Sequence, residues 1–390
     1  MNLSAEPKVK NRVLLALLLM MSIADLCLPV LTDAPNRLLS GTGITLFALL
    51  DRHSIGLLLP FCLLAALSFV PQIQATRILT AVGATLLLFG FSLLAGFTAS
   101  RLSGGEDSLV RISFGGAFWV SSGLCGLIAA DAIARASPRR SIHILANLLV
   151  FAPVVGLLFG GQLDQLSIMK EYANRKEVFD DAVLRHLEIL ALTLVPAVML
   201  ALPMGVMGFR RPRAQRALFT VLNMIQTIPS IALFGLLIAP LAMLARQLPW
   251  LAEHGVGGIG MAPAIIALVL YSLLPLVRSI VAGLEQVPPA VIEAAHGMGL
   301  TRTQVFLHVE APLALPVFLS GLRVTAVQAV GLTVVAALIG AGGLGGIVFQ
   351  GLLSSALDLV LLGVIPVVVL AVIVDSVFKF IVSSLETAHA

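Results

Sequence analysis

Four uncharged polar residues, Asn223, Gln226, Thr227 and Ser230, interrupt a long apolar run of the sequence. Their spacing of i, i+3, i+4 and i+7 places all four side chains on one face of a helix. A stripe of amides and hydroxyls inside a membrane can hydrogen-bond a small polar solute, but it can equally bond a neighbouring helix. The set therefore predicts a translocation pathway along 223–230, with interhelical hydrogen bonding as the alternative for each single residue.

Ionisable residues within apolar runs form a second set, because a charge at the centre of a bilayer costs a few kcal/mol and requires a partner, water or a function. The set is Asp25, Asp131, His143, Glu188, Arg323 and Asp375. Most of them lie close enough to the end of a run for the charged group to reach the interface. Arg323 lies deeper in its run. It either lines the pathway together with Gln328 or pairs with a carboxylate from another span, and we favour the pairing.

The composition identifies the class of protein in which these residues act. Hydrophobic residues make up 59% of the 390, only 11% are charged, and the mean hydropathy is +1.05. A soluble globular domain has roughly 25% charged residues, and disordered chains are poor in apolar residues. Both classes are excluded, which leaves a membrane protein with several spans.

Ten apolar runs, most of them about 18 or more residues long, predict membrane-spanning helices. The runs are about 13–31, 55–71, 78–99, 112–134, 142–160, 186–208, 217–245, 262–282, 313–340 and 359–382. They lack the alternation of polar and apolar residues that is typical of a transmembrane barrel. The predicted fold class is therefore all-α, a polytopic membrane helical bundle.

A polar interval at about 161–185 separates the first five predicted spans from the last five. We expect it to divide an accessory N-terminal bundle at 1–160 from a core at 161–390. Lys and Arg concentrate in cytoplasmic loops, and the cluster RRPRAQR at 210–216 is the strongest signal of this kind. The pattern predicts that both the N- and the C-terminus lie in the cytoplasm.

One loop predicted to be cytoplasmic, 283–312, is long and patterned. Pro288 and Pro289 suit the first turn of a helix, and Gly297 and Gly299 can adopt the left-handed conformation that ends one. The loop therefore begins with a short helix outside the bilayer.

A second short helix should follow in the same loop. Thr301 and Gln304 have the spacing of a capping box, and we expect Pro312 to stop the helix that starts there. A bent pair of short helices between two spans can dock in a groove of a soluble partner. From the residues alone, an amphipathic loop lying on the lipid surface is an equal alternative.

The same loop resembles the EAA motif of ABC importer permeases. The motif is Glu-Ala-Ala at 293–295, Gly299, an aliphatic residue at Val309 and Pro312. The resemblance implies a type I ABC importer permease-like core whose loop contacts the ATP-binding subunit. The residues that would make or shape this coupling site are Glu293, Ala294, Ala295, Gly297, Gly299, Thr301, Gln304 and Pro312.

Four longer stretches are similar to permeases of the osmoprotectant branch, which imports glycine betaine, choline, carnitine or proline betaine. They are 223–238, 262–284, 292–323 and 336–352, and the similarity covers about 185–385. The first 160 residues look like the extra spans of the long members of this branch, with no role assigned.

The resemblance also implies partners and a location. The partners are a pair of ATP-binding subunits on the cytoplasmic side, a second permease copy or paralogue, and a soluble solute-binding protein outside. ATP and Mg²⁺ would be bound by the ATP-binding subunits and no cofactor by this chain. The location would be the bacterial inner membrane.

The sequence lacks features that a self-sufficient pump or an enzyme needs. A G-x-x-x-x-G-K-[ST] phosphate loop is absent, and we find no catalytic or metal-binding cluster in the sequence. Residues 340–345 match G-x-G-x-x-G, but a dinucleotide site needs a strand before the turn, and here a long apolar run precedes it. We interpret this motif as a glycine-rich turn between closely packed helix ends. A secondary transporter or channel that works alone is the alternative function.

Overall fold

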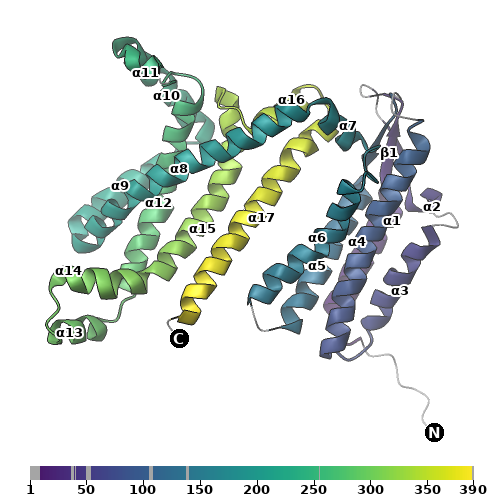
Figure 1. The fold of residues 1–390 in the computed structure, drawn as a ribbon, viewed down its shortest axis with the longest axis horizontal. Coiled ribbons are helices and arrows are strands. Elements are labelled where there is room, and N and C mark those ends of the chain that lie inside the picture. Colours follow the sequence, from purple (N-terminus) through teal and green to yellow (C-terminus); the bar gives the residue numbers. More distant parts are fainter. Residues whose placement is uncertain are drawn as a thin grey trace, which may run out of the picture. The chain divides into compact units, whose positions relative to one another are not determined.

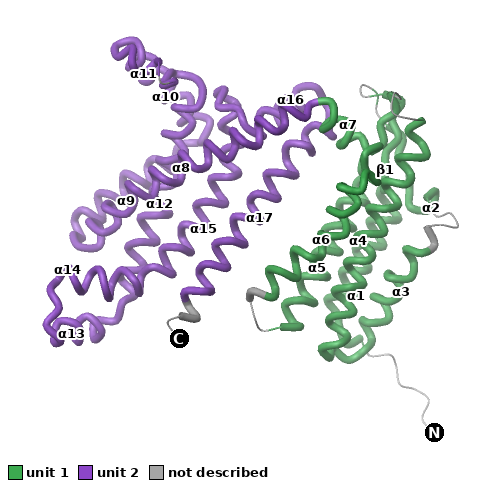
Figure 2. Tube along the Cα trace, viewed as in Figure 1, with its two compact units in different colours: residues 1–174 green, residues 175–390 purple. Residues whose placement is uncertain are grey.

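The computed structural model describes residues 9–36, 39, 41–49, 54–104, 109–137, 140–253 and 255–388 (Figure 1). Most of them are helical, and the chain divides into two compact units, Met1–Asn174 and Arg175–Ala390 (Figure 2). Each unit has its own buried core, so each is described separately.

Unit 1 is a helical bundle built around α4. Its helices are α1 (Arg12–Cys27), α2 (Leu46–Leu49), the 3₁₀ turn η1 (Ser54–Leu57), α3 (Leu58–Leu67), α4 (Gln74–Leu102), α5 (Gly116–Ala136), α6 (Arg140–Phe159) and α7 (Ser167–Asn174). α4 packs against α3, α5 and α6. Buried residues of α4 such as Leu87 and Phe91 lie in the centre of the unit's core.

A small antiparallel sheet lies at the end of unit 1 where α1 finishes. Its strands are β1 (Leu31–Ala34), β2 (Thr42–Ile44) and β3 (Arg111–Phe114), in the order β2-β1-β3, with Leu31 paired to both Ile44 and Phe114. The sequence prediction was wrong here, because it assigned 13–31 and 112–134 wholly to helices. The chain leaves the helical conformation where strand pairing satisfies backbone groups beyond the helix ends.

Unit 2 is a second bundle, in which α12 packs between α8 and α15. Its elements are α8 (Lys176–Arg210), α9 (Pro212–Thr227), α10 (Ser230–Gln247), α11 (Pro249–Glu253), α12 (Met261–Glu285), α13 (Pro289–Gly297), α14 (Arg302–Val305), a π-helical turn (Phe306–Glu310), α15 (Ala311–Ala336), the 3₁₀ turn η3 (Ala337–Ile339), α16 (Leu344–Leu353) and α17 (Leu357–Ala388). α17 covers α15 and α16.

Within the described residues, eight helices are long and apolar enough to cross a membrane. Two of the ten predicted spans are helices of insufficient length by this measure, namely α1 with 16 residues and α3 with ten. The all-α polytopic fold class is confirmed.

The predicted span at 217–245 is two helices, not one. α9 ends at Thr227 and α10 starts at Ser230, with Ile228 in an extended conformation (φ −73°, ψ 126°). Pro229 explains the break, because proline disfavours the helical conformation of the residue before it and has no N–H to continue the ladder.

Glycines allow the close approach of the three central helices of unit 2. A β-carbon at Gly205 of α8 would lie 2.5 Å from the Ile280 side chain, and one at Gly321 of α15 would lie 2.2 Å from Cβ of Ser279. From α12 itself, a β-carbon at Gly283 would lie 2.8 Å from the backbone oxygen of Ala314. Small residues at such contacts let helix backbones pack tightly in a membrane.

We predict that Gly321→Ala lowers the free energy of unfolding by about 1–3 kcal/mol, since the added methyl group must push α15 away from α12. The thermal unfolding midpoint of the protein in detergent measures the loss. Gly331→Ala on the same helix is the control, because a β-carbon there meets nothing within 4 Å. Equal midpoints for the two variants would contradict the packing argument.

Candidate functional site

The loop between α12 and α15 begins with a short helix, as the sequence predicts. Pro288 precedes α13 and Pro289 is its first residue. Gly299 follows with a φ of +87°, a left-handed conformation that favours glycine. Gly297 differs from the prediction, because it is the last residue of α13 and its φ is not positive. Gly299 alone therefore reverses the chain.

The capping box at the second helix is confirmed. The backbone N–H of Thr301 donates to Oε1 of Gln304 over 2.9 Å, and the backbone N–H of Gln304 donates to Oγ1 of Thr301 over 3.4 Å. These bonds satisfy donors that the first turn of a helix leaves unpaired.

Pro312 does not stop this helix, contrary to the prediction. α14 continues through the π-helical turn at 306–310 into α15, and Pro312 lies in the first turn of α15. The N–H of Ala311 bonds to the oxygen of Phe306, five residues back. This shifted register accommodates a residue that cannot donate to the ordinary ladder.

The two short helices enclose a small apolar contact and present other residues outward. Ala295 of α13 and Val305 of α14 are 1% and 2% exposed. Glu293 and Ala294 are exposed, and so is Met298, at 74%. Of the two alanines in the motif, Ala294 is therefore accessible to a partner, whereas Ala295 is buried within the loop.

The loop and the end of α12 from which it starts contact two other helices. The Arg210 guanidinium, at the end of α8, lies 5.0 Å from the centre of the Phe306 ring, within the range of a cation–π interaction. On α9, Gln215 donates to the carboxylate of Glu285 over 3.3 Å. The loop therefore contacts α8 directly, whereas the contact with α9 is made by the end of α12 from which the loop starts.

The polar stripe lies at the break between α9 and α10. Asn223, Gln226 and Thr227 belong to α9 and Ser230 starts α10, so the four do not share a face of one continuous helix. The correction follows from the break at Pro229.

Two residues of the stripe bond to α12. Nε2 of Gln226 donates to the backbone oxygen of Tyr271 over 2.9 Å, and the Tyr271 hydroxyl donates to the oxygen of Ile228. Nη2 of Arg278 donates to Oδ1 of Asn223 over 2.7 Å. The hydroxyl of Thr227 donates to the oxygen of Met224 in its own helix. For Gln226 and Asn223, the structure therefore contains the interhelical hydrogen bonds that the sequence analysis gave as the alternative to a pathway.

Arg323 pairs with a carboxylate from another span. Its Nε lies 2.8 Å from Oδ1 of Asp375 on α17, whose Oδ2 lies 2.6 Å from Nζ of Lys379. Gln328, five residues further along α15, is exposed and has no such partner among the interactions of the described residues.

The other ionisable residues of the sequence-derived set are also engaged. Their partners are Ser121 for Asp25, Arg135 for Asp131, the backbone oxygen of Ser137 for His143, and Arg185 for Glu188. Partners within the protein thus account for the whole set.

The sequence analysis missed two buried polar residues of α8. His186 and Thr193 are fully buried and lie seven residues apart, hence on one face. Gly343 packs against His186, where a β-carbon would lie 3.4 Å from Nδ1. The signal available in the sequence was the i, i+7 spacing of these two polar residues. Apolar residues surround them in the sequence, and these do not distinguish a face of α8 that is buried in the protein from one that faces lipid.

The glycine-rich turn at 340–345 follows helical structure. Gly340, Gly342 and Gly343 have φ values of +79°, +82° and +75°. A β-carbon at Gly345 would lie 2.1 Å from the oxygen of Val334. Residues 311–339 before the turn are helical, so the strand that a dinucleotide site requires is absent from this described segment. The turn joins closely packed helix ends.

Comparison with known proteins decides the family. Residues 197–387 match the family described as binding-protein-dependent transport system inner membrane component. The osmoprotectant import permease protein OsmW of Salmonella typhimurium is 36% identical over 191 residues, which cover 49% of this chain and 84% of that protein. The chain belongs to the ABC importer permeases.

Further relatives of this permease match the same region. The carnitine transport permease protein OpuCB of Listeria monocytogenes is 37% identical over 49% of this chain and 80% of the relative. The choline transport system permease protein OpuBB of Bacillus subtilis is 34% identical, over 49% and 81%. Residues 10–169 match the N-terminal domain of the ABC transporter permease YehY. Among solved structures, an inward-facing conformation of the MetNI methionine ABC transporter matches with 24% identity and a TM-score of 0.47. The match covers 54% of this chain and 98% of the MetNI chain.

Family membership determines the type of activity. The permease is a transport subunit of the inner membrane, and ATP is hydrolysed by a separate subunit of the system, which also includes a solute-binding protein. A transporter that works alone is not favoured.

The ion pair between α15 and α17, together with the neighbouring pair of Lys379 with Asp375 within α17, allows a test of how the charges inside unit 2 are stabilised. We predict that Asp375→Asn lowers the thermal midpoint more than Arg323→Gln, because the first leaves both Arg323 and Lys379 without their carboxylate, whereas the second leaves Asp375 paired to Lys379. The double variant should lose less than the sum of the singles. Strictly additive losses in detergent-solubilised protein would rule out this coupling.

Proposed function

We propose that this permease carries osmoprotectants, such as glycine betaine or related quaternary ammonium compounds, with ATP hydrolysis on a partner driving their translocation. The observation that supports the solute class is the match of the core to relatives named for osmoprotectant, carnitine and choline transport. Carnitine and choline are small polar solutes of one chemical type, the quaternary ammonium compounds. The third name, osmoprotectant, denotes the group of solutes that contains them.

The aromatic residues support solute selection by another protein. A quaternary ammonium group is bound tightly by several aromatic rings around the cation. The chain has only Trp119, Trp250, Tyr172 and Tyr271 besides phenylalanines. Trp119 packs edge-on against Phe114 and Phe118 in unit 1, and the Tyr271 hydroxyl bonds to the α9–α10 break. We assign the high-affinity step to the soluble binding protein.

The coupling site of this proposal is the loop from α13 to the π-helical turn. Its exposed residues Glu293, Ala294 and Met298 would contact the ATP-binding subunit, and Ala295, Gly299 and the Thr301–Gln304 box would hold its shape. ATP and Mg²⁺ would be bound by that subunit. A second permease copy or paralogue would complete the pore.

The orientation belongs to the same proposal. The loop and the C-terminal end of α17 lie at the same end of unit 2 (Figure 1). The arginine-rich segment at 210–216 follows the end of α8, next to the loop residue Phe306. With positive charge retained in the cytoplasm, this end and both chain termini would be cytoplasmic.

The pathway in this proposal is narrower than the sequence suggested. Thr227 and Gln328 are exposed and would line it, while Asn223 and Gln226 bond to α12 and Ser230 starts the helix after the break beside it. Arg323 would act on the pathway only through its ion pair with Asp375.

We predict that Glu293→Lys abolishes stable association with the ATP-binding subunit, because it reverses the charge at the centre of the exposed face of α13. Co-purification of the solubilised chain with the candidate subunit measures this. Glu253→Lys, an exposed carboxylate at the end of α11, is the matched control and should associate normally. Normal association of Glu293→Lys would place the coupling site elsewhere.

A second prediction addresses the pathway. In liposomes that contain the permease, its ATP-binding subunit and its binding protein, Thr227→Val should reduce uptake of labelled glycine betaine several-fold without loss of association, because it removes a hydroxyl from an exposed position. Ser383→Ala, near the end of α17, is the control. Uptake of histidine in place of glycine betaine would refute the proposed solute class, and ATP-independent uptake would refute the coupling.

A further inference from the structure

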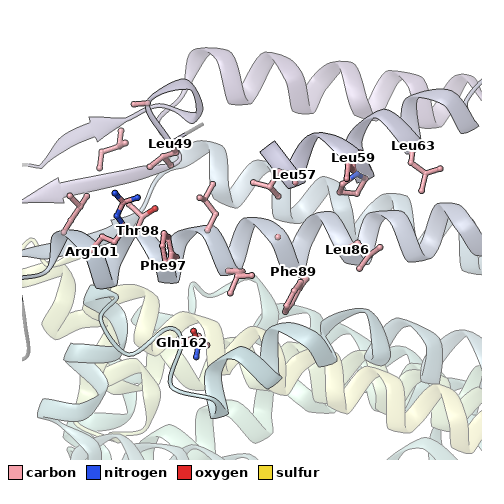
Figure 3. Close-up of a pocket in the computed structure, with 18 residues that line it drawn as sticks. Leu49, Leu57, Leu59, Leu63, Leu86, Phe89, Phe97, Thr98, Arg101 and Gln162 are labelled. Atoms are coloured by element: carbon pink, nitrogen blue, oxygen red, sulfur yellow. The ribbon is translucent and has the colours of Figure 1, made fainter. Parts of the chain in front are cut away.

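Unit 1 contains a large cavity between α4 on one side and η1 and α3 on the other (Figure 3). Most of its wall is made of leucine and phenylalanine side chains. A small zwitterionic solute would be poorly matched to such a surface, since it would lose its hydration without gaining polar partners. Polar groups that are available to bind such a solute lie in unit 2 instead.

Two buried polar side chains of unit 2, His186 and Thr193 of α8, lack hydrogen-bond partners. Neither ring nitrogen of His186 and not the hydroxyl of Thr193 has a partner among the residues that the structure describes. Other buried hydroxyls of the unit differ, because those of Ser272, Thr325 and Thr333 each donate to the backbone oxygen four residues earlier in their own helix. Thr193 does not make this bond.

Water does not satisfy these groups in the present conformation. Both residues are 0% exposed, so no space of the size of a water molecule touches either side chain. A buried polar group without a partner costs free energy, because its bonds to water are lost and not replaced. A movement of the neighbouring helices that admitted water or a polar solute would remove this cost.

The two residues lie where α8 contacts α15. Leu190, between them on the same face, is buried in one cluster with Val330 of α15. The ring of His186 approaches the backbone of Val330, without a hydrogen bond of regular geometry. Gln328, which the proposed function places on the pathway, lies two residues before Val330. The unsatisfied groups therefore adjoin the proposed pathway.

The contact between α8 and α15 is looser than the contact that each helix makes with α12. Gly205 of α8 lets its backbone approach Ile280 of α12, and Gly321 of α15 does the same at Ser279 of α12. α12 packs against both helices more extensively than they pack against each other. Separation of α8 from α15 therefore disrupts less packing than separation of either helix from α12.

The glycine-rich turn after α15 covers His186. A β-carbon at Gly343 would lie 3.4 Å from Nδ1 of His186. Gly340, Gly342 and Gly343 all have positive φ values, and glycine changes between backbone conformations with little steric restriction. The turn lies at the end of α15 opposite the loop that carries α13 and α14 (Figure 1). It has the properties of a hinged cover at that end.

We propose that His186 and Thr193 line the solute route in a second conformation, in which α8 and α15 separate at this end and the turn at 340–343 leaves His186. The imidazole N–H and the threonine hydroxyl then donate to the carboxylate of a zwitterionic solute. The two residues are about 10 Å apart along α8, so a small solute meets them in succession. The solute class and the outward orientation of this end rest on the proposed function.

The first test asks whether position 193 becomes accessible during the transport cycle. The three native cysteines are replaced by alanine, and Thr193→Cys is treated with a methanethiosulfonate that carries a trimethylammonium group. The chain is in complex with its ATP-binding subunit, either without nucleotide or trapped with ATP and vanadate. We expect the labelling rates of the two states to differ by about tenfold or more. Ser272→Cys, at a buried hydroxyl of α12, is the matched control and should stay unlabelled in both.

The second test separates a role in transport from a role in stability. Thr193→Val keeps the size of the side chain and removes no hydrogen bond, so the thermal midpoint should not fall. In liposomes with the ATP-binding subunit and the binding protein, its uptake of glycine betaine should fall several-fold. Thr333→Val, on α15, is the control and should keep its uptake.

Equal labelling of Thr193→Cys in the two states, whether fast or absent, overturns the proposal, and so does native uptake by Thr193→Val. Failure of the proposed solute class gives a different result. In that case the native chain takes up no glycine betaine, whereas position 193 is still labelled in one nucleotide state only, and the route along α8 stands.

Discussion

The close packing of α12 between α8 and α15 is the constraint on which the rest of unit 2 depends. Lipid solvates apolar side chains as well as a protein interior does, so helices in a membrane associate through tight contact and hydrogen bonds rather than through hydrophobic burial. Here Gly205, Gly283 and Gly321 remove the side chains that would keep the three backbones apart. α17 then packs on α15, and the ion pair of Arg323 with Asp375 adds a directional contact to that interface.

This packing brings one short loop into contact with the ends of all three helices. The loop starts at the end of α12 and continues without a break into α15, because the π-helical turn carries the chain past Pro312. Through Phe306 it also contacts Arg210 at the end of α8. The ends of three tightly packed helices therefore meet at this one loop.

Sequence reasoning predicted the features that depend on local chemistry. Proline at the start of α13, the left-handed Gly299 and the Thr301–Gln304 box all follow from the conformations allowed to a few neighbouring residues. Sequence reasoning failed where the conformation or burial of a residue depends on a part of the chain that is distant in the sequence. Strand β3, for example, pairs with β1, which lies about 80 residues earlier in the sequence. The burial of Ala295 depends on the second helix of the loop, and that of His186 on the glycine-rich turn at 343.

The polar residues of unit 2 show why a pathway is difficult to read from sequence. A polar group in a membrane must be satisfied at all times, and protein partners satisfy it more permanently than a passing solute. Asn223 and Gln226 bond to α12, and Arg323 pairs with Asp375, so these groups stabilise the fold. If the proposed pathway runs along this surface, a solute would meet few groups that must exchange partners to bind it. Weak contact of this kind would favour release over retention, in agreement with the proposal that another protein selects the solute.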